Sequence, residues 1–223
     1  MQSLADNLND IRERISAAAK RSGRDPTEIK LVVVSKTHPV EKLREAMAAG
    51  ASVFGENKVQ EGESKIVEIG RDGIEWHLIG HLQSNKARKA VQFYDVIQSL
   101  DSIELAERLE RICKEEGRDK LSVFAQVDLA GEKTKSGVPE SELTGLAEFL
   151  RTCKHLSFDG FMVLPPFFDA PEATRPFFKQ LREIRDAMLP NGELSMGMSH
   201  DFEVAIEEGA TIVRVGTAIF GKR

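Results

Sequence analysis

A lysine, Lys36, stands just after an apolar run in the segment VVVSKTHP. The valines of that run, 32–34, are typical of a strand in a parallel sheet that is covered on both faces. A lysine amine buried without a partner is costly, and such amines shift their pKa or take part in chemistry. The segment alone leaves two alternatives open: a strand-end lysine that reaches solvent, or an amine kept for a covalent bond to a carbonyl compound.

Small and hydroxyl-bearing residues gather near the carboxyl end of the sequence, around a second cation. Arg214 precedes Gly216 and Thr217 in VRVGTAIFG, and Ser199 precedes a predicted helix in SMGMSHDF. Hydroxyl groups and close backbone approach are what a phosphate cradle at a helix start requires. Ser199 is equally suited to be only the N-cap of the following helix, so both interpretations of it stay open.

These residues together describe a site for pyridoxal 5'-phosphate (PLP). Lys36 and Arg214 inside one barrel would repel each other unless an anionic or electron-rich group lay between them. A PLP site needs a lysine that forms a Schiff base with the aldehyde, a cradle for the phosphate and a partner for the pyridine nitrogen. The sequence therefore predicts that PLP is bound through Lys36.

Strand and helix patterns alternate along the chain and predict a single (β/α)8 TIM barrel, an α/β fold, preceded by one extra helix. The predicted strands cover 31–36, 53–55, 75–79, 95–99, 121–128, 158–163, 193–196 and 211–215. The predicted helices cover 40–49, 57–68, 84–92, 102–117, 139–152, 172–188, 200–208 and 217–220. The domain is expected to span 1–223, with the extra helix at 1–22 and the barrel at 31–220. A doubly wound open sheet is the alternative, but no GxGxxG opens a helix.

Composition narrows the class of protein. The chain has 223 residues, 41% of them hydrophobic, and a net charge of -5, which argues against a general nucleic-acid binder. Its two cysteines, Cys113 and Cys153, lack metal-ligand spacing, and the histidines have no second ligand at such spacing, so we expect no metal site. The N-terminus does not resemble a signal peptide and no apolar run approaches membrane-spanning length, so a cytoplasmic protein without a membrane partner is expected.

Seven motifs in order make the sequence resemble the pyridoxal phosphate homeostasis protein family, which is similar to the N-terminal barrel of alanine racemase. They are VVVSKTHP, FGENKVQE, WHLIGHLQSNK, SGV, DGFMVLPP, LSMGMSHDFEVAI and VRVGTAIFG. One departure is Lys58, where many relatives have an aromatic residue after GEN, and MVLPP is a looser variant of the family's Met-rich segment.

The resemblance implies a role for each matched residue. It places the PLP-bearing amine at Lys36 and Arg214 at the pyridine nitrogen. The remaining cofactor-binding residues that we expect are Asn57, His77, Met162, Ser199, Gly216 and Thr217. Asn57 and His77 are expected near the cofactor ring, and the last three at the phosphate.

Catalysis is not expected from this set of residues. Racemisation needs a base on each face of the substrate, and the single tyrosine, Tyr94, is predicted at the end of the barrel away from the site. Arg214 would leave the pyridine nitrogen largely unprotonated, which makes the ring a poorer electron sink. We expect no second domain, and hence a monomeric PLP carrier whose partners are PLP-dependent apoenzymes or amino acids. An amino-acid racemase and a cofactor-free Schiff-base aldolase are the alternatives.

Overall fold

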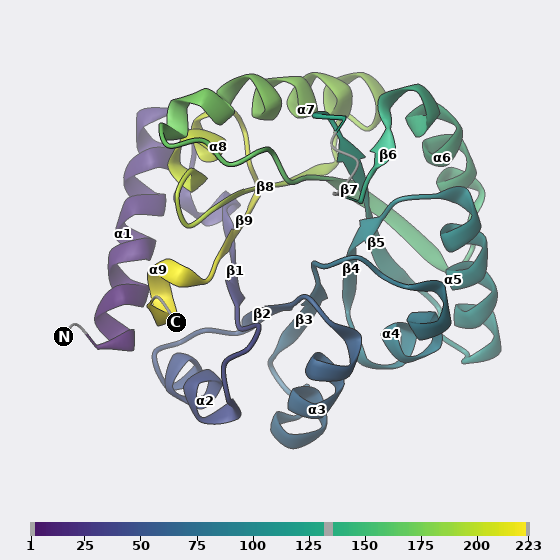
Figure 1. The fold of residues 1–223 in the computed structure, drawn as a ribbon, viewed down its shortest axis with the longest axis horizontal. Coiled ribbons are helices and arrows are strands. Elements are labelled where there is room, and N and C mark those ends of the chain that lie inside the picture. Colours follow the sequence, from purple (N-terminus) through teal and green to yellow (C-terminus); the bar gives the residue numbers. More distant parts are fainter. Residues whose placement is uncertain (1–2, 132–135, 222–223) are drawn as a thin grey trace.

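The computed structural model describes residues 3–131 and 136–221, and its centre is a closed barrel of parallel strands (Figure 1). Eight strands form the ring, because β4 pairs with β5 and so joins the two ends of the sheet. A ninth, two-residue strand pairs with β5 outside the ring. The strands are β1 (Lys30–Val34), β2 (Val53–Glu56), β3 (Glu75–Leu78), β4 (Val96–Leu100), β5 (Leu121–Asp128), β6 (Val138–Pro139), β7 (Leu156–Val163), β8 (Glu193–Met198) and β9 (Ile212–Val215).

Helices surround this ring, as Figure 1 shows. They are α1 (Leu4–Arg21), α2 (Val40–Ala48), α3 (Val59–Ile69), α4 (Ala87–Phe93), α5 (Ile103–Glu115), α6 (Glu140–Thr152), α7 (Arg175–Met188), α8 (Phe202–Glu207) and α9 (Thr217–Phe220). Three short 3-10 helices cover Pro26–Glu28, Ser84–Lys86 and Pro171–Thr174. The predicted barrel with an extra N-terminal helix is confirmed. No helix in the described part of the chain is long and apolar enough to cross a membrane.

Two predicted boundaries were wrong in ways that bear on the site. The first strand ends at Val34 rather than at residue 36, so Lys36 lies in a turn. Thr37, which follows, has φ 64°, a left-handed conformation that ends the strand and is unfavourable for a β-branched residue. The helix predicted at 172–188 begins at Arg175, after a 3-10 turn that contains Pro171.

Apolar side chains fill both faces of the sheet. The larger cluster packs between the strands and the helices that cover them. A smaller cluster fills the lumen of the barrel and consists of Val32, Val96, Phe124, Met162 and Ile212. Since successive side chains of a strand point to opposite faces, a single strand can contribute to both clusters, as β1 does with Val33 and Val32.

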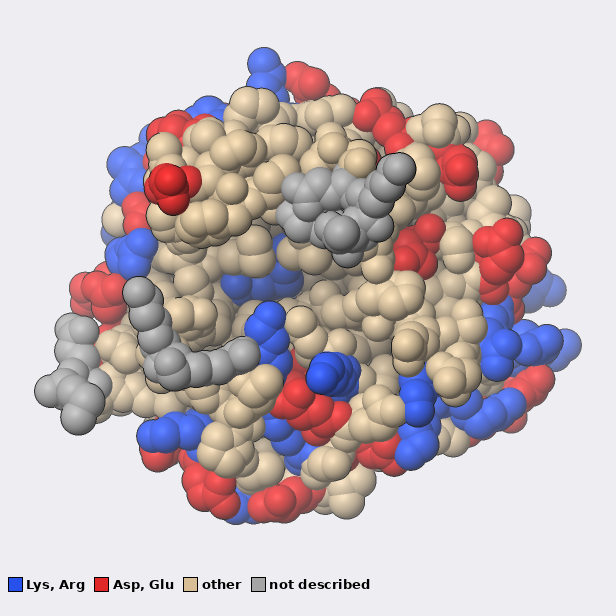
Figure 2. All heavy atoms as spheres, in the orientation of Figure 1, with Lys and Arg blue, Asp and Glu red and all other residues tan. Residues whose placement is uncertain are grey.

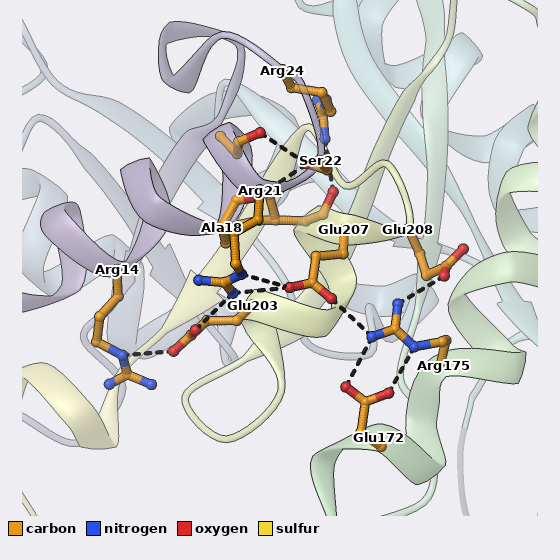
Figure 3. A network of polar contacts seen from close by, with 12 residues as sticks. Arg14, Ala18, Arg21, Ser22, Arg24, Glu172, Arg175, Glu203, Glu207 and Glu208 are labelled. Carbon is orange, nitrogen blue, oxygen red and sulfur yellow. Dashed lines mark hydrogen bonds and ion pairs between the residues drawn. The ribbon is translucent and has the colours of Figure 1, made fainter.

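Ion pairs fasten α1 and α7 to α8 (Figure 3). Arg14 binds Glu203 at 2.8 Å, and Arg21 binds Glu203 at 3.1 Å and Glu207 at 2.9 Å. Arg175 of α7 also binds Glu207, at 2.8 Å. These pairs are half-exposed, so each contributes little by itself. As a network, they hold α8 in place between the last two strands.

Gly62 of α3 permits the close approach of Tyr94, whose hydroxyl oxygen lies 3.3 Å from the carbonyl oxygen of Lys58. A Cβ atom at Gly62 would overlap that hydroxyl group, whereas a Cβ at Gly145 of α6 would meet nothing closer than 3.8 Å. We predict that Gly62→Ala lowers the free energy of unfolding by about 1–3 kcal/mol through overpacking. Gly145→Ala, the matched control, should be neutral or raise it by up to about 1 kcal/mol.

Urea denaturation of the two variants measures this difference. Adding Tyr94→Phe to Gly62→Ala should recover part of the loss, because the overlapping oxygen is removed. Equal stability of the two alanine variants would contradict the packing described here.

Candidate functional site

A cavity of about 860 Å³ lies at the carboxyl ends of the barrel strands. Figure 2 shows this face hollowed near its centre, with basic side chains inside the hollow. Six of the eight predicted site residues line the cavity, and they come from β9 itself and from the segments that follow β1, β2, β8 and β9: Lys36, Asn57, Ser199, Arg214, Gly216 and Thr217. The barrel thus brings together residues that are far apart in the sequence.

His77 and Met162 are not in the cavity wall. Both are fully buried in the lumen, and in each case the residue two positions later, Ile79 or Leu164, lines the cavity instead. The structure therefore places these two residues one inward-facing position below the wall. Their predicted contact with a bound ligand is not supported by this geometry.

The backbone on both sides of Lys36 is held by α3. The ammonium group of Lys65 donates to the carbonyl oxygen of Ser35 at 2.8 Å, and the carboxylate of Glu61 accepts a hydrogen bond from the backbone N–H of Thr37. Lys65 and Glu61 are themselves paired at 2.8 Å. The half-buried Lys36 therefore begins from a backbone that is fixed before and after it, although the strand has already ended.

A second carboxylate, that of Glu56, completes this arrangement, which we call the α3 clamp (Ser35, Thr37, Glu56, Glu61 and Lys65). Glu56 is fully buried and accepts from the hydroxyl of Ser35 at 2.6 Å and from Lys65 at 2.7 Å. Burial raises the pKa of Glu56, although both hydrogen bonds act in the opposite direction. All three N–H bonds of the Lys65 ammonium group have acceptors in the clamp, so its hydrogen-bonding capacity is satisfied within the protein.

Arg214 lies in the cavity wall but is only 3% exposed. Its guanidinium group donates to the hydroxyl oxygen of Ser195 at 2.5 Å and to the carbonyl oxygen of Val163 at 2.9 Å. Burial lowers the pKa of Arg214 to about 10, against the effect of the nearby carboxylate of Asp201. The group therefore remains cationic near neutral pH and has a fixed orientation.

Ser199 bridges the loops that follow β8 and β9. Its hydroxyl oxygen accepts from the backbone N–H groups of Gly216 and Ala218, each at 3.3 Å. The N-cap of α8 is Asp201, so the alternative that Ser199 caps that helix was wrong. Gly216 lies so close to β1 that a Cβ atom there would be 2.9 Å from the carbonyl oxygen of Val34. A hydroxyl group and exposed loop backbone thus lie on one side of the cavity.

Tyr94 takes no part in the cavity. It is fully buried against α3, where Gly62 makes room for its ring, so the prediction that it lies away from the site agrees with the structure. Sequence reasoning missed other residues of the wall, among them His81, Gln126 and Asp201. Gln126 could have been found as a polar residue near the carboxyl end of strand 121–128, on the same face as Phe124. No group of histidine, cysteine or acidic residues in the described ranges could hold a metal ion.

The α3 clamp makes a testable contribution to stability. We predict that Lys65→Met lowers the free energy of unfolding by about 3–5 kcal/mol, because it leaves the buried carboxylate of Glu56 without its cation. Lys89→Met is the matched control, since Lys89 pairs with Glu63 at 2.6 Å on the surface and should contribute only about 0–1 kcal/mol. Denaturant titration at pH 7 gives both values, and similar losses for the two lysines would contradict the role assigned to the clamp.

Comparison with known proteins places the fold in a family. Residues 6–223 match the family model of the alanine racemase N-terminal domain. An alanine racemase from Oenococcus oeni has the same fold over 98% of this chain and 56% of that protein, with a TM-score of 0.70 and 20% identity. At this level of identity, the likeness concerns the fold alone.

More similar relatives match over nearly their whole length. A pyridoxal phosphate homeostasis protein from Aquifex aeolicus is 42% identical over 98% of this chain and 97% of its own. That of Escherichia coli K12 is 41% identical, with coverage of 100% and 98%. The structure of PipY from Synechococcus elongatus with PLP bound is 42% identical, covers 95% of this chain and 100% of that one, and superposes with a TM-score of 0.78. The chain therefore belongs to the pyridoxal phosphate homeostasis protein family.

Proposed function

We propose that this protein binds PLP in the cavity as a Schiff base on Lys36 and acts in PLP homeostasis as a carrier rather than as an enzyme. The observation that supports this most strongly is the placement of a held lysine, a buried arginine and a hydroxyl-lined loop around one cavity. The name of the relatives and the PLP-bound structure of PipY support the same ligand.

The residues present fit the chemistry of PLP. The cavity volume of about 860 Å³ lies within the usual range of small-molecule sites. The close packing of Gly216 on Val34 leaves loop backbone, rather than a side chain, next to the hydroxyl of Ser199, which suits a phosphate. Arg214 offers donors only, so it suits an unprotonated ring nitrogen. Asn57 and Thr217 also line the cavity.

Each side chain has a distinct task in this proposal. Lys36 would hold the cofactor, because its unprotonated amine can condense with the aldehyde carbon and release water. The α3 clamp fixes the backbone from which Lys36 extends. Bound PLP supplies an aldehyde that can be passed to another amine. The ring nitrogen, the phosphate and the aldehyde of the cofactor would then each contact a separate part of the cavity wall.

Trapping with borohydride tests the site directly. Reduction of the PLP-loaded protein followed by peptide mass mapping should place the pyridoxyl group on Lys36, because this lysine lines the cavity and Lys65 is consumed by the clamp. Lys36→Arg should abolish the adduct while leaving the unfolding transition unchanged. An adduct on another lysine would overturn the assignment.

The residues proposed to bind the phosphate give a second prediction. Ser199→Ala should weaken PLP binding by the equivalent of about one charge-assisted hydrogen bond, roughly 1.5–3 kcal/mol, and should leave the weaker binding of pyridoxal nearly unchanged. Ser64→Ala, an exposed serine of α3 whose hydroxyl bonds to Gln60, is the control. Equal affinity of the wild-type protein for pyridoxal and PLP would refute the proposed phosphate site.

Racemisation is the alternative that the cavity disfavours. The tyrosine hydroxyl lies between α3 and α4, outside the cavity, and the cationic Arg214 disfavours a protonated ring nitrogen. We predict that D- and L-alanine in heavy water, with protein and PLP, show no inversion coupled to deuterium incorporation at the α-carbon. Exchange with inversion at an ordinary enzymatic rate, on the order of 1–10³ per second, would show that the protein is a racemase. The expectations of a monomer and of a cytoplasmic location stay predictions.

A further inference from the structure

Five polar side chains form one continuous hydrogen-bonded chain through the lumen of the barrel, which we call the lumen chain. Its donor–acceptor distances are 2.5 Å from Arg214 Nη1 to Ser195 Oγ, 2.6 Å from Ser195 Oγ to Gln98 Oε1, 2.6 Å from Gln98 Nε2 to His77 Nδ1, and 2.6 Å from His77 Nε2 to Glu75 Oε1. The residues come from β9, β8, β4 and β3. All except Glu75 are at most 3% exposed.

The two ends of the lumen chain fix its direction. Arg214 has donors only, and Glu75 is ionised, because the hydrogen bond from His77 lowers the pKa of this carboxyl to about 2 despite partial burial. His77 must therefore carry its proton on Nε2. Burial lowers the pKa of His77 and keeps the ring neutral, so Nδ1 accepts from the amide NH₂ of Gln98.

The remaining hydrogen bonds follow from that tautomer. With its NH₂ directed at His77, Gln98 presents Oε1 to the hydroxyl of Ser195, whose oxygen is then left to accept from Arg214. Every donor points away from Arg214 and toward Glu75. Hydrogen bonds aligned in this way polarise one another, which strengthens the whole chain.

Arg214 needs such a chain because the carboxylate of Asp201 acts on it without a hydrogen bond, and its neighbour on β1, Val32, is apolar. A buried cation without compensation is costly. Glu75, at the far end, is only half-buried and pairs with Lys30 at 3.0 Å, so it is anchored at the opposite end of the lumen. Ser195, the first acceptor in the chain, therefore orients the guanidinium group together with the carbonyl oxygen of Val163.

We propose that Ser195, Gln98, His77 and Glu75 are positioning residues that orient Arg214 toward the ring nitrogen of the bound cofactor and so determine selectivity for a nitrogen-containing aromatic ring. This inference rests on the proposed function. It predicts that a side chain without any contact to the ligand, Gln98, changes how well the protein distinguishes PLP from its 1-deaza analogue, in which CH replaces the ring nitrogen.

The experiment compares dissociation constants of PLP and 1-deaza-PLP for the full chain. The wild-type protein should prefer PLP by roughly 10-fold or more, because the analogue leaves a charged donor of Arg214 without its acceptor. Ser195→Ala and Gln98→Met should each reduce this preference severalfold. Ser157→Ala is the control, since Ser157 also lies on a barrel strand and donates to a carboxylate, that of Asp159 at 2.6 Å, outside the lumen chain.

Each outcome supports or overturns the proposal. An equal loss of affinity for both ligands would indicate a merely structural role and would overturn it, as would an unchanged preference in Gln98→Met. A wild-type protein that binds neither ligand would refute the proposed function itself, whereas one that binds PLP with variant-independent selectivity would refute only this inference.

A measurement on the unaltered protein guards against variants that fail to fold. Nitrogen-15 NMR of the ring of His77 should show a neutral imidazole with its proton on Nε2 between pH 6 and 8, with or without PLP. A proton on Nδ1 would reverse the direction of the lumen chain and overturn the proposal.

Discussion

The buried guanidinium group of Arg214 is the charge around which the inside of the barrel is arranged. A cation that is 3% exposed needs oriented acceptors, and the structure provides the hydroxyl of Ser195 and the carbonyl of Val163. The polar positions in the lumen, on otherwise apolar strands, follow from this need. Arg214 and Lys36 line the same cavity, and the guanidinium group is held there by its bonds to Ser195 and Val163.

A second polar system lies on the other side of β1 and β2. The α3 clamp binds backbone groups before and after Lys36, where the strand has ended and Thr37 adopts a left-handed conformation. Strain of that kind persists only where the surroundings hold it. The lumen chain therefore holds the guanidinium group of Arg214, and the α3 clamp holds the backbone around Lys36. In the proposed function, these are the two groups that bind the ring nitrogen and the aldehyde.

Much of this could be predicted from the sequence. The alternation of strands and helices gave the barrel, and the rule that function gathers at the carboxyl ends of strands brought Lys36, Arg214 and Ser199 together. Alternation indicates which face a residue occupies but not its height along the barrel axis. His77 and Met162 do face inward, yet they lie one position below the cavity wall. Their height could not be predicted, because no local sequence pattern indicates the stagger of neighbouring strands.

The α3 clamp escaped prediction for a different reason. Glu61 and Lys65 are spaced i, i+4, which is the usual pattern of a solvent-exposed helical ion pair. Only the packing of α3 on β2 buries Lys65 beside Glu56 and turns an ordinary surface pair into a support for Lys36. Likewise, the sequence could not decide whether Ser199 caps α8 or contacts the loop after β9, since that depends on how the two loops meet.

The most direct test of the account is a high-resolution crystal structure of the protein with PLP. We expect continuous density between Lys36 Nζ and the aldehyde carbon, the guanidinium group of Arg214 within hydrogen-bond distance of the ring nitrogen, and the bond from Arg214 to Ser195 unchanged at about 2.5 Å. A ligand attached elsewhere, or an Arg214 that leaves Ser195 to reach the phosphate, would contradict it.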